Sequence, residues 1–390
     1  MDHHGTCGKM SYKKALIFLI SICLVSLNSV LYRVSAQELH VGGTGDGNYT
    51  SIQDAIDNAY PGDTIYVHQN TYIETIYIDK SLTLIGLDRP TINGDNTTSV
   101  VTIKADNVTF INFELIEAGQ PNPPKFHRTV SGIYTEGSYC NISYIFFGLN
   151  GSMLSSFNNS HNTYSHLTFT TNHFLSGAGI YLQDSNYNTI KENAIYYSHG
   201  NGIHLCNSTH NEIFKNYIEY NYRGIFIQSG SESNNVFNNT LLDCWNCSMK
   251  LLLNGNNTII NNNFIFNRMG GNVYDHSSNY YDKNYWSDYE GNDTNQDGYG
   301  DTPYEVACYY QYGITCGENF DYNPLMQPYG NESFPPWDIN QDGFINFLDA
   351  SMLLACYGQS GPPGWIPEDI NEDGFVNYLD SSIVVEHYGE

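Results

Sequence analysis

The sequence predicts an all-β protein whose short strands stack as successive turns of a coil, followed by a small acidic module. The first observation is a repeat of 22 or 23 residues in which apolar positions recur. The second is that these positions lie in short alternating runs separated by Asn, Gly and Ser, which is typical of strands and turns. The third is a composition of 390 residues with 33 Tyr and only 15 Lys and Arg.

The N-terminal residues 1–36 are expected to be a secretory signal peptide. Lys9, Lys13 and Lys14 precede a nearly continuous apolar run at 15–27, and a small-residue cleavage site follows at 34–36. An uncleaved membrane anchor is the alternative. No later segment is long and apolar enough to span a bilayer, so the mature protein is expected to be secreted, extracellular or attached to the cell surface.

The repeat occupies the middle of the chain and predicts a stacked coil. A unit of this length cannot close its own core, so neighbouring units are expected to stack and to bury their apolar columns inside. A column of Asn at the same spacing is expected at one turn of each unit, in left-handed backbone geometry, with its amides bonded to those above and below. The apolar columns are Ile190, Ile213, Val236 and Ile259, then Ile195, Ile218, Leu241 and Phe264, and the Asn column is Asn193, Asn216, Asn239 and Asn262.

Residues 37–327 resemble right-handed parallel β-helix proteins of the pectin-lyase-like fold. The resemblance rests on a cap-helix pattern at 49–59, a first-strand pattern at 61–67, and Gly-Ile strands with Asn-rich turns. The most similar subtype is the carbohydrate-binding and sugar-hydrolase repeat group, which includes a periplasmic protein of nitrous-oxide-reductase maturation. The resemblance implies an all-β, right-handed parallel β-helix with an N-terminal cap helix. It leaves the activity open, because this fold carries lyases, hydrolases, epimerases and inert surface proteins.

The net charge of the chain argues against one class of partner. A formal net charge of −26 argues against nucleic-acid binding, which needs clustered Lys and Arg.

Seven Cys remain after the signal, an odd number. Cys308 and Cys316 are expected to form a disulfide, and Cys244 and Cys247 have redox-motif spacing although a structural role is favoured.

The acidic C-terminal end contains two copies of a calcium-loop pattern. Oxygen-bearing side chains stand at positions 1, 3, 5, 9 and 12, a carbonyl at position 7 and Gly at position 6, which is the arrangement that Ca²⁺ requires. The expected ligands are Asp338, Asn340, Asp342, Phe344 (carbonyl), Asn346 and Asp349 in the first copy, and Asp369, Asn371, Asp373, Phe375 (carbonyl), Asn377 and Asp380 in the second.

These two loop–helix units, at 337–390, resemble a dockerin, a small α-helical calcium-folded module that binds cohesins; residues 328–336 would be its linker. The resemblance implies a cohesin-bearing partner that contacts positions 10 and 11 of each loop. Those positions are Phe347 and Leu348 in the first copy and Tyr378 and Leu379 in the second. The alternative is that these side chains only pack the core of the module.

A third, incomplete calcium loop is expected at 293–301, where the coil ends. It has oxygens at positions 1, 3, 5 and 9 but Tyr304 at position 12, and a plain Asp/Gly turn is the alternative. Its expected ligands are Asp293, Asn295, Asp297, Tyr299 (carbonyl) and Asp301.

Whether the coil is an enzyme is left open by the sequence. A glycosidase usually needs two carboxylates that flank the sugar bond, and no acid pair repeats from unit to unit. If the protein is an enzyme, a glycoside hydrolase or a polysaccharide lyase is expected. The titratable candidates in the most regular units are Asp184, Glu192, Glu212, Glu219 and His204, and the alternative is that they are solvated surface groups.

A column of rings in the Gly-Ile strands is the candidate binding surface. If Ile180, Ile203 and Ile225 point inward, then Tyr181, His204 and Phe226 point outward and stack along one face. Such a column suits sugar rings, although ring stacking that only stabilises the sheet is the alternative.

Three functions follow from these patterns. The first is a polysaccharide-binding or polysaccharide-degrading protein that docks to a cohesin. The second is a non-catalytic surface, scaffold or adhesion protein. The third, weaker reading is copper handling through His199, His204 and His210.

Overall fold

The computed structural model describes most of the chain after the predicted signal. The described residues are 36–94, 98–116, 131–148, 152–169, 177–197, 200–253, 255–265, 272–307, 319–330, 337–339, 345, 347–361, 366–371 and 373–388, with the side chains of 347, 348 and 355 excepted. Among them, no helix has the length and apolar character needed to cross a bilayer.

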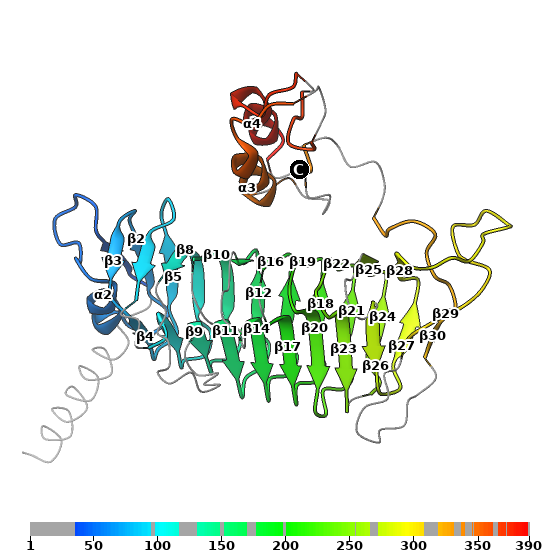
Figure 1. Cartoon of the computed structure of the whole chain (residues 1–390). Helices are drawn as coiled ribbons and strands as arrows, with labels where there is room; N and C mark the ends of the chain where they lie inside the picture. Colours follow the sequence, from blue (N-terminus) through cyan, green and yellow to red (C-terminus); the bar gives the residue numbers. More distant parts are fainter. Residues whose placement is uncertain are drawn as a thin grey trace, which may run out of the picture.

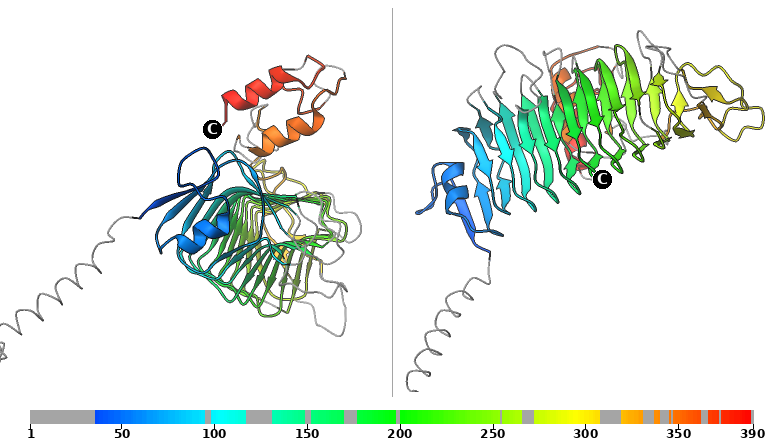
Figure 2. Two further views of the ribbon diagram at one scale, coloured as in Figure 1. Left: turned by 90° about the vertical axis from the view of Figure 1, so that its left-hand side faces the viewer. Right: turned by 90° about the horizontal axis from the view of Figure 1, so that it is seen from below.

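The chain winds into an elongated coil whose strands form two parallel sheets (Figures 1 and 2). In a regular turn, two short strands enter the first sheet and one longer strand enters the second, as β18, β19 and β20 do. Sheet B, the second, is β4 (Ile76–Ile78), β7 (Val101–Ile103), β9 (Ser131–Thr135), β11 (Ser152–Phe157), β14 (Ala178–Gln183), β17 (Asn201–Cys206), β20 (Arg223–Gln228), β23 (Cys247–Leu252) and β26 (Val273–Asp275).

Sheet A contains the short strands, and its only antiparallel pair among the described residues is β29 with β30. Its strands are β1 (Glu38–Val41), β2 (Thr64–Val67), β3 (Thr71–Ile73), β5 (Thr83–Gly86), β6 (Thr91–Asn93), β8 (Thr109–Ile116), β10 (Asn141–Gly148), β12 (Thr163–Ser165), β13 (Thr168–Phe169), β15 (Thr189–Lys191), β16 (Ala194–Tyr196), β18 (Glu212–Phe214), β19 (Tyr217–Glu219), β21 (Asn235–Phe237), β22 (Thr240–Leu242), β24 (Thr258–Ile260), β25 (Asn263–Ile265), β27 (Tyr280–Asp282), β28 (Tyr285–Trp286), β29 (Tyr304–Glu305) and β30 (Phe320–Asp321).

The predicted apolar columns form the interior of the coil. Ile190, Ile213, Val236 and Ile259 are register partners in successive turns, and each is fully buried. The column that begins at Ile195 is buried in the same way. Because a fully buried Ile or Val side chain contributes roughly 1.5–3 kcal/mol, these columns supply the free energy that a single turn cannot supply alone.

The N-terminal end of the coil is closed by the predicted cap helix, α2 (Ile52–Asn58), which buries Ile52, Ala55 and Ile56. The backbone N–H groups of Ile52 and Gln53 donate to the Glu74 carboxylate, at 2.8 and 3.0 Å. A carboxylate at a helix N-terminus satisfies N–H groups that have no partner within the helix. The prediction that 61–67 holds the first strand was wrong, because β1 precedes the helix and pairs with β2.

The predicted Asn column forms a continuous hydrogen-bonded ladder. Asn193 donates through its backbone N–H and its side-chain amide to Oδ1 of Asn216, and the same pair of bonds continues to Asn239, Asn262 and Asn284. A second ladder at another corner runs through Asn162, Asn188, Asn211, Asn234, Asn257 and Asn279.

The expected left-handed geometry of the Asn column was wrong by one residue. Positive φ belongs to the residue before each ladder Asn, as at Glu192 (56°), Lys215 (54°) and Asn238 (57°). The left-handed residue turns the chain and projects outward. The following Asn side chain can then lie inside the corner and bond to the turns above and below.

A buried Asp accepts hydrogen bonds near the C-terminal end of each Asn ladder, and in the second ladder the backbone N–H of Asn279 also donates to Oδ1 of a further Asn, Asn319. Asn284 donates its backbone N–H and its amide to Oδ2 of Asp321, and Asn279 donates its amide to both carboxylate oxygens of Asp275. A carboxylate has only acceptors, so it can receive the last donors of a ladder without needing a further partner. Burial raises the pKa of both carboxyl groups, in the case of Asp275 to about 6.

The raised pKa of Asp275 predicts that stability falls as pH rises from 4 to 6. In this window the folded state keeps a proton that the unfolded chain, with a pKa of about 3.9, releases. The loss amounts to about 3 kcal/mol. Urea unfolding at several pH values should show a shallower fall for Asp275→Asn and an unchanged fall for the exposed control Asp79→Asn. Equal pH slopes for all three proteins would contradict this prediction.

The C-terminal residues form two helices that follow the two predicted calcium loops, α3 (Phe347–Cys356) and α4 (Tyr378–Glu386). Both helices begin at position 10 of the preceding loop. A small core joins the two units and contains Ile339, Ile345, Leu353, Val376 and Val384.

Some sequence-based predictions concern residues outside the described part of the chain. These are the signal at 1–35, the Cys308–Cys316 disulfide, His199, and the first-loop residues Asn340, Asp342, Phe344 and Asn346, together with the side chains of Phe347 and Leu348. Cys244 and Cys247 are described, and both are buried and not joined in a disulfide.

Candidate functional site

The most continuous exposed aromatic surface is a stack of four rings at the corner that leads into sheet A. We call Tyr139, His161, Tyr187 and His210 the ring ladder. Their ring centroids are 4.7, 5.4 and 4.8 Å apart in that order, and neighbouring ring planes lie within 23° of parallel. All four side chains are exposed, with 59% of Tyr139 and 52% of Tyr187 accessible.

The backbone fixes the ring ladder in place. Each of its residues has positive φ, between 56° and 59°. In three of the four turns the next residue is a buried ladder Asn, namely Asn162, Asn188 or Asn211. The rings therefore repeat once per turn, about 4.8 Å apart, and their exposed edges present phenol hydroxyls and imidazole nitrogens in a row.

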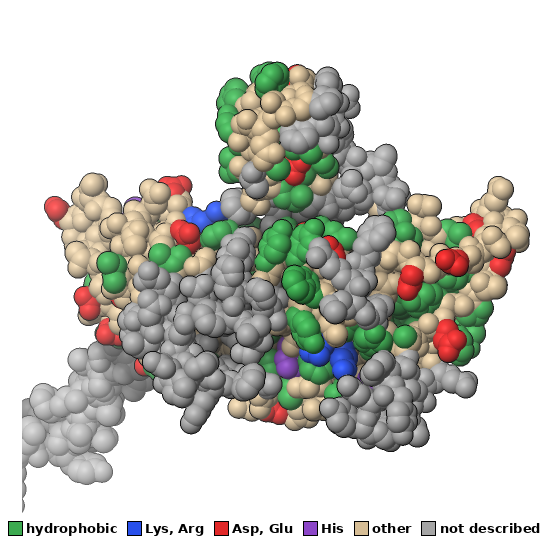
Figure 3. Space-filling model, in the orientation of Figure 1, with side chains coloured by type: hydrophobic (Ala, Val, Ile, Leu, Met, Phe, Trp, Pro, Cys, Tyr) green, Lys and Arg blue, Asp and Glu red, His purple; other side chains and the backbone are tan. Residues whose placement is uncertain are grey.

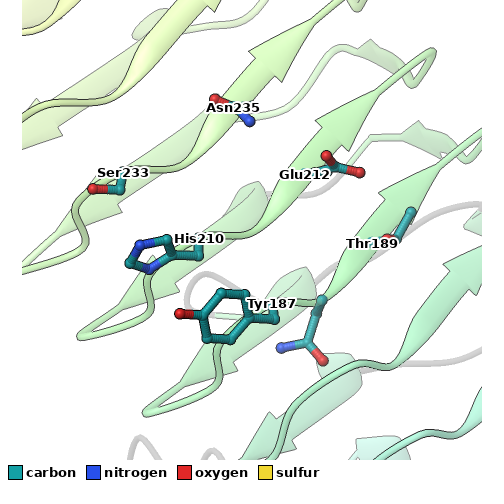
Figure 4. A pocket seen from close by; sticks show the side chains of 7 residues that line it. Tyr187, Thr189, His210, Glu212, Ser233 and Asn235 are labelled. Carbon is teal, nitrogen blue, oxygen red and sulfur yellow. The ribbon is translucent and has the colours of Figure 1, made fainter.

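The ring ladder ends at a surface pocket of about 300 Å³ (Figure 4). The next residue at this corner is Ser233, which carries no ring, so the ring face of His210 on that side is not covered by another ring. Figure 4 shows Tyr187 and His210 in adjacent turns, with the Glu212 carboxylate on the following strand. The lining residues are Tyr187, Asn188, Thr189, His210, Glu212, Ser233 and Asn235, of which Glu212 is the only acid.

The predicted ring column of sheet B is buried and stacks only in part, because Tyr181 meets His204 edge to face at 70° whereas His204 and Phe226 stack at 27°. Tyr181 and His204 have centroids 5.0 Å apart, and His204 and Phe226 are 4.8 Å apart. Their exposed fractions are only 2, 6 and 9%, which leaves almost no ring surface for a sugar. The expectation of an open binding face at this column was therefore wrong, and ring stacking within the sheet is what the structure shows.

The structure disperses the predicted catalytic candidates. Glu212 lies in the pocket, whereas Asp184 lies at the end of β14 and accepts a hydrogen bond from Asn207. Glu192 lies 3.0 Å from Lys191 and 3.6 Å from His166. His204 belongs to the buried ring column of sheet B.

Glu219 is the acid with the most perturbed environment among the candidates. Burial raises its pKa and the charge of Asp243 raises it further, while a hydrogen bond from Tyr217 acts in the opposite direction. It lies on the second short strand of sheet A, where its register partners are Tyr196 and Leu242. Its surroundings would keep it protonated to higher pH than an ordinary Glu, which suits a general acid.

The second and third of the predicted calcium loops fold alike. In both, the backbone N–H of position 5 donates to the side-chain oxygens of positions 1 and 3, and that of position 6 donates to position 1. The N–H of position 7 donates to position 5 in both loops, at 2.9 Å. Asp301 at position 9 of the third loop accepts from the N–H of Thr294, whereas in the second loop Asp380 at position 12 accepts from Asn371.

The side-chain chemistry of the C-terminal module fits a bound cation. Asp338, Asp349, Asp369 and Asp380 stand at positions 1 and 12 of the two loops, and each is at most 2% exposed. No Lys or Arg follows Lys283 in the sequence, so this module has no basic side chain, apart from His387, to balance them. Within the described ranges, however, no three His, Cys, Asp or Glu side chains are already gathered as a metal site.

Sequence reasoning missed the ring ladder because its residues lie in turns, outside the alternating strands that were searched. A signal was present nonetheless: Tyr187 and His210 stand directly before Asn residues that repeat every 23 positions. A residue immediately before a ladder Asn has positive φ and projects outward. The same rule places Ser233 and Asn256 at this corner in later turns.

Several solved structures are similar to this chain at low sequence identity. The enzymatically active domain of tailspike protein 2 from bacteriophage CBA120 is 15% identical, over 64% of this chain and 48% of that one, with a TM-score of 0.45. The chain thus spans about half of that domain. PfbA, a surface adhesin of Streptococcus pneumoniae, is 15% identical over 64% and 78%, with a TM-score of 0.48. A pectate lyase is 15% identical over 65% and 76%, with a TM-score of 0.38.

Among curated proteins, none matches the sequence. Residues 91–265 match the family model described as a right handed beta helix region. This segment runs from β6 to β25 and contains both Asn ladders over most of their length. The coil of this protein is therefore a right-handed parallel β-helix.

Proposed function

We propose that the protein acts outside the cell and binds a polysaccharide along the ring ladder. The observation that carries the proposal is the continuous row of exposed rings that ends at the pocket beside His210 and Glu212. The ring edges offer one hydrogen-bonding group per turn to a polymer rich in hydroxyls. The uncovered face of His210 offers an apolar platform for the C–H face of one sugar ring.

The ring ladder supports binding, and non-catalytic adhesion is the physiological role that such binding would serve most directly. Hydrolysis by two carboxylates needs a second acid across the sugar bond, and Glu212 is the only acid that lines the pocket. Glu219 and Asp243 are the acids that would carry a hydrolytic function instead. Product analysis on any glycan that binds distinguishes the two roles.

A glycan-array screen of the full chain with calcium tests the binding proposal. For each glycan that binds, His210→Ala and Tyr187→Ala are each expected to weaken the affinity about two- to tenfold, because each removes one aromatic contact worth roughly 0.5–1.5 kcal/mol. Tyr77→Ala is the matched control, since Tyr77 is 48% exposed but lies on sheet B outside the ring ladder. Absence of binding to every glycan, or equal losses in all three variants, would contradict the proposal.

We also propose that calcium holds the C-terminal module, which then docks to a cohesin-bearing protein. Asp369, Asn371, Asp373 and Asp380 would supply side-chain oxygens in the second loop, with the equivalent first-loop positions supplying the other set. Calcium would balance the buried carboxylates and fix the loops against the helices. The third loop, Asp293 to Asp301, would take a further ion near the C-terminal end of the β-helix.

Exposed apolar side chains on the second repeat support docking. Tyr378 is 71% exposed, Leu379 53%, Phe375 59% and Val385 68%. Clustered exposed apolar side chains on so small a module are typical of a protein-binding surface. Tyr378 and Leu379 are therefore not core residues of the module, which was the alternative considered for them.

Titration of purified cohesin domains onto the full chain tests the docking proposal. The double variant Tyr378→Ala and Leu379→Ala is expected to lower the affinity at least thirtyfold, as loss of a central aromatic anchor costs 2 kcal/mol or more. Tyr322→Ala is the control, because Tyr322 is 66% exposed and lies outside the module. Unchanged affinity in the double variant, or no cohesin bound at any calcium concentration, would refute docking at this surface.

A further inference from the structure

Two basic side chains lie together on the outer face of sheet B, and we call Arg223 and Lys250 the cationic pair. Lys250 is the register partner of Phe226 in the next turn, and Arg223 Cζ lies 5.0 Å from the centroid of the Phe226 ring. Both side chains are half-buried. Figure 3 shows Lys or Arg side chains beside a His side chain in this part of the coil, with hydrophobic side chains around them.

In the part of the chain that the structure describes, no carboxylate balances the cationic pair. Neither side chain takes part in an ion pair among the described residues. The pKa of Lys250 is lowered by burial and then by the charge of Arg223, and the only opposing influence is Cys247. Two like charges are thus held close together in a partly dry environment, which is unfavourable unless a negative charge joins them.

Two other lysines of the coil each lie beside a carboxylate that balances their charge. Lys104 also lies over a ring on sheet B, 4.7 Å from the centroid of Tyr134, but its Nζ is 2.7 Å from the Glu136 carboxylate. Lys191 is likewise 3.0 Å from Glu192. In a chain with 41 acidic and 15 basic residues, acids are the commoner charged neighbours. The cationic pair therefore differs from its surroundings in kind.

The hydrogen-bond donors of Arg223 are only partly satisfied. Arg223 donates to Oδ1 of Asn201 at 3.4 Å and also interacts with Cys247, but among the described residues its buried Nε–H has no acceptor. A buried donor of this kind calls for an explanation in a folded protein. An arginine fork that lacks its own acceptors is suited to two parallel bonds with a carboxylate or a related oxyanion.

We propose that the cationic pair is an anion subsite that takes the carboxylate or sulfate group of an acidic saccharide. Phe226 packs beside Arg223 and is only 9% exposed, so the two cations themselves are the ligand-binding groups. The proposal rests on the proposed polysaccharide-binding function for the nature of the ligand, and it narrows that ligand to acidic glycans. It does not rest on the ring ladder, which lies at a corner and not on sheet B.

The first test uses the full chain with calcium and three probes at matched ionic strength: glucuronate, inorganic sulfate and uncharged glucose. Calorimetry is expected to show binding of at least one anion and none of glucose. The double variant Arg223→Gln and Lys250→Met is expected to weaken anion binding at least tenfold, and Lys104→Met, which removes a neutralised cation, is expected to leave it unchanged. Preference for glucuronate or for sulfate identifies which oxyanion the subsite takes.

A second measurement needs no variant. NMR of lysines reductively methylated with ¹³C should show one lysine whose pKa is low in the free protein and rises when the anion is added. The proposal is overturned if the pKa of Lys250 does not change with any anion, or if anion binding persists in the double variant. If neutral glycans then still bind through His210 in the same preparation, only the anion subsite is contradicted and the ring-ladder function is supported. Anion binding without any glycan binding would support the anion subsite and contradict the ring-ladder function.

Discussion

Removal of calcium is expected to unfold the C-terminal module and to leave the β-helix folded. The module buries Asp338, Asp349, Asp369 and Asp380 almost completely. An uncompensated buried carboxylate costs several kcal/mol, and an apolar core of five fully buried side chains cannot offset four of them. An ion present at about a thousand times its dissociation constant would contribute roughly 4 kcal/mol per site.

Hydrogen exchange followed by mass spectrometry measures this effect in the full chain. Peptides from α3 and α4 should lose protection in chelator and regain it with added Ca²⁺, while peptides from β14 to β25 should not change. Asp369→Asn should raise the calcium concentration needed for protection, and the exposed Asp79→Asn should not. Equal protection of the helices with and without chelator would show that the module does not need the ion.

Interruption of an Asn ladder is expected to give the second large effect. The Asn216 amide donates to the carbonyl oxygens of Ile190 and Phe214 and to Oδ1 of Asn239, and Oδ1 of Asn216 accepts two bonds from Asn193. Asn216→Ala would leave these buried groups without partners, and each unsatisfied group costs about 1–3 kcal/mol. We expect a loss of at least 3 kcal/mol in the free energy of unfolding.

Equilibrium denaturation in urea, with calcium present throughout, measures the loss. Asn235→Ala is the control, because Asn235 is also an Asn of a regular turn but is exposed, and its change should stay within about 0.5 kcal/mol. If Asn216→Ala and Asn235→Ala unfold at the same urea concentration, the ladder contributes little to stability and the apolar columns alone hold the turns together.

The fold was predictable from the sequence because each turn repeats the same burial problem. Ile190, Ile213 and their register partners all lie in the buried interior, and their regular spacing in the sequence predicted this. The site was harder to predict, because side-chain direction and exposure are different quantities. Alternation correctly turned Tyr181 and Phe226 away from the core, but it carries no information about what packs over the outer face of a sheet.

The ring ladder lay beyond the prediction for another reason. Exposed turn residues follow neither the two-residue period of strands nor any apolar pattern. Tyr187 and His210 become recognisable only when the buried Asn that follows each of them has been assigned to the corner. The cationic pair was equally hidden, since Arg223 and Lys250 are 27 positions apart and only the register of β20 and β23 brings them together.

The amide ladders give the coil a direction. From Asn193 onward, each Asn of the first ladder donates its backbone N–H and one amide N–H to Oδ1 of the Asn in the following turn, and Asp321 accepts the last of these bonds. A copy of an interior turn inserted between two others would find hydrogen-bond partners in both neighbours. The same copy added after Asp321 would follow a carboxylate, which has no side-chain proton to donate to the next Asn. Lengthening of this protein over evolutionary time is therefore expected to proceed by duplication from within, with the terminal pair of acids carried along unchanged.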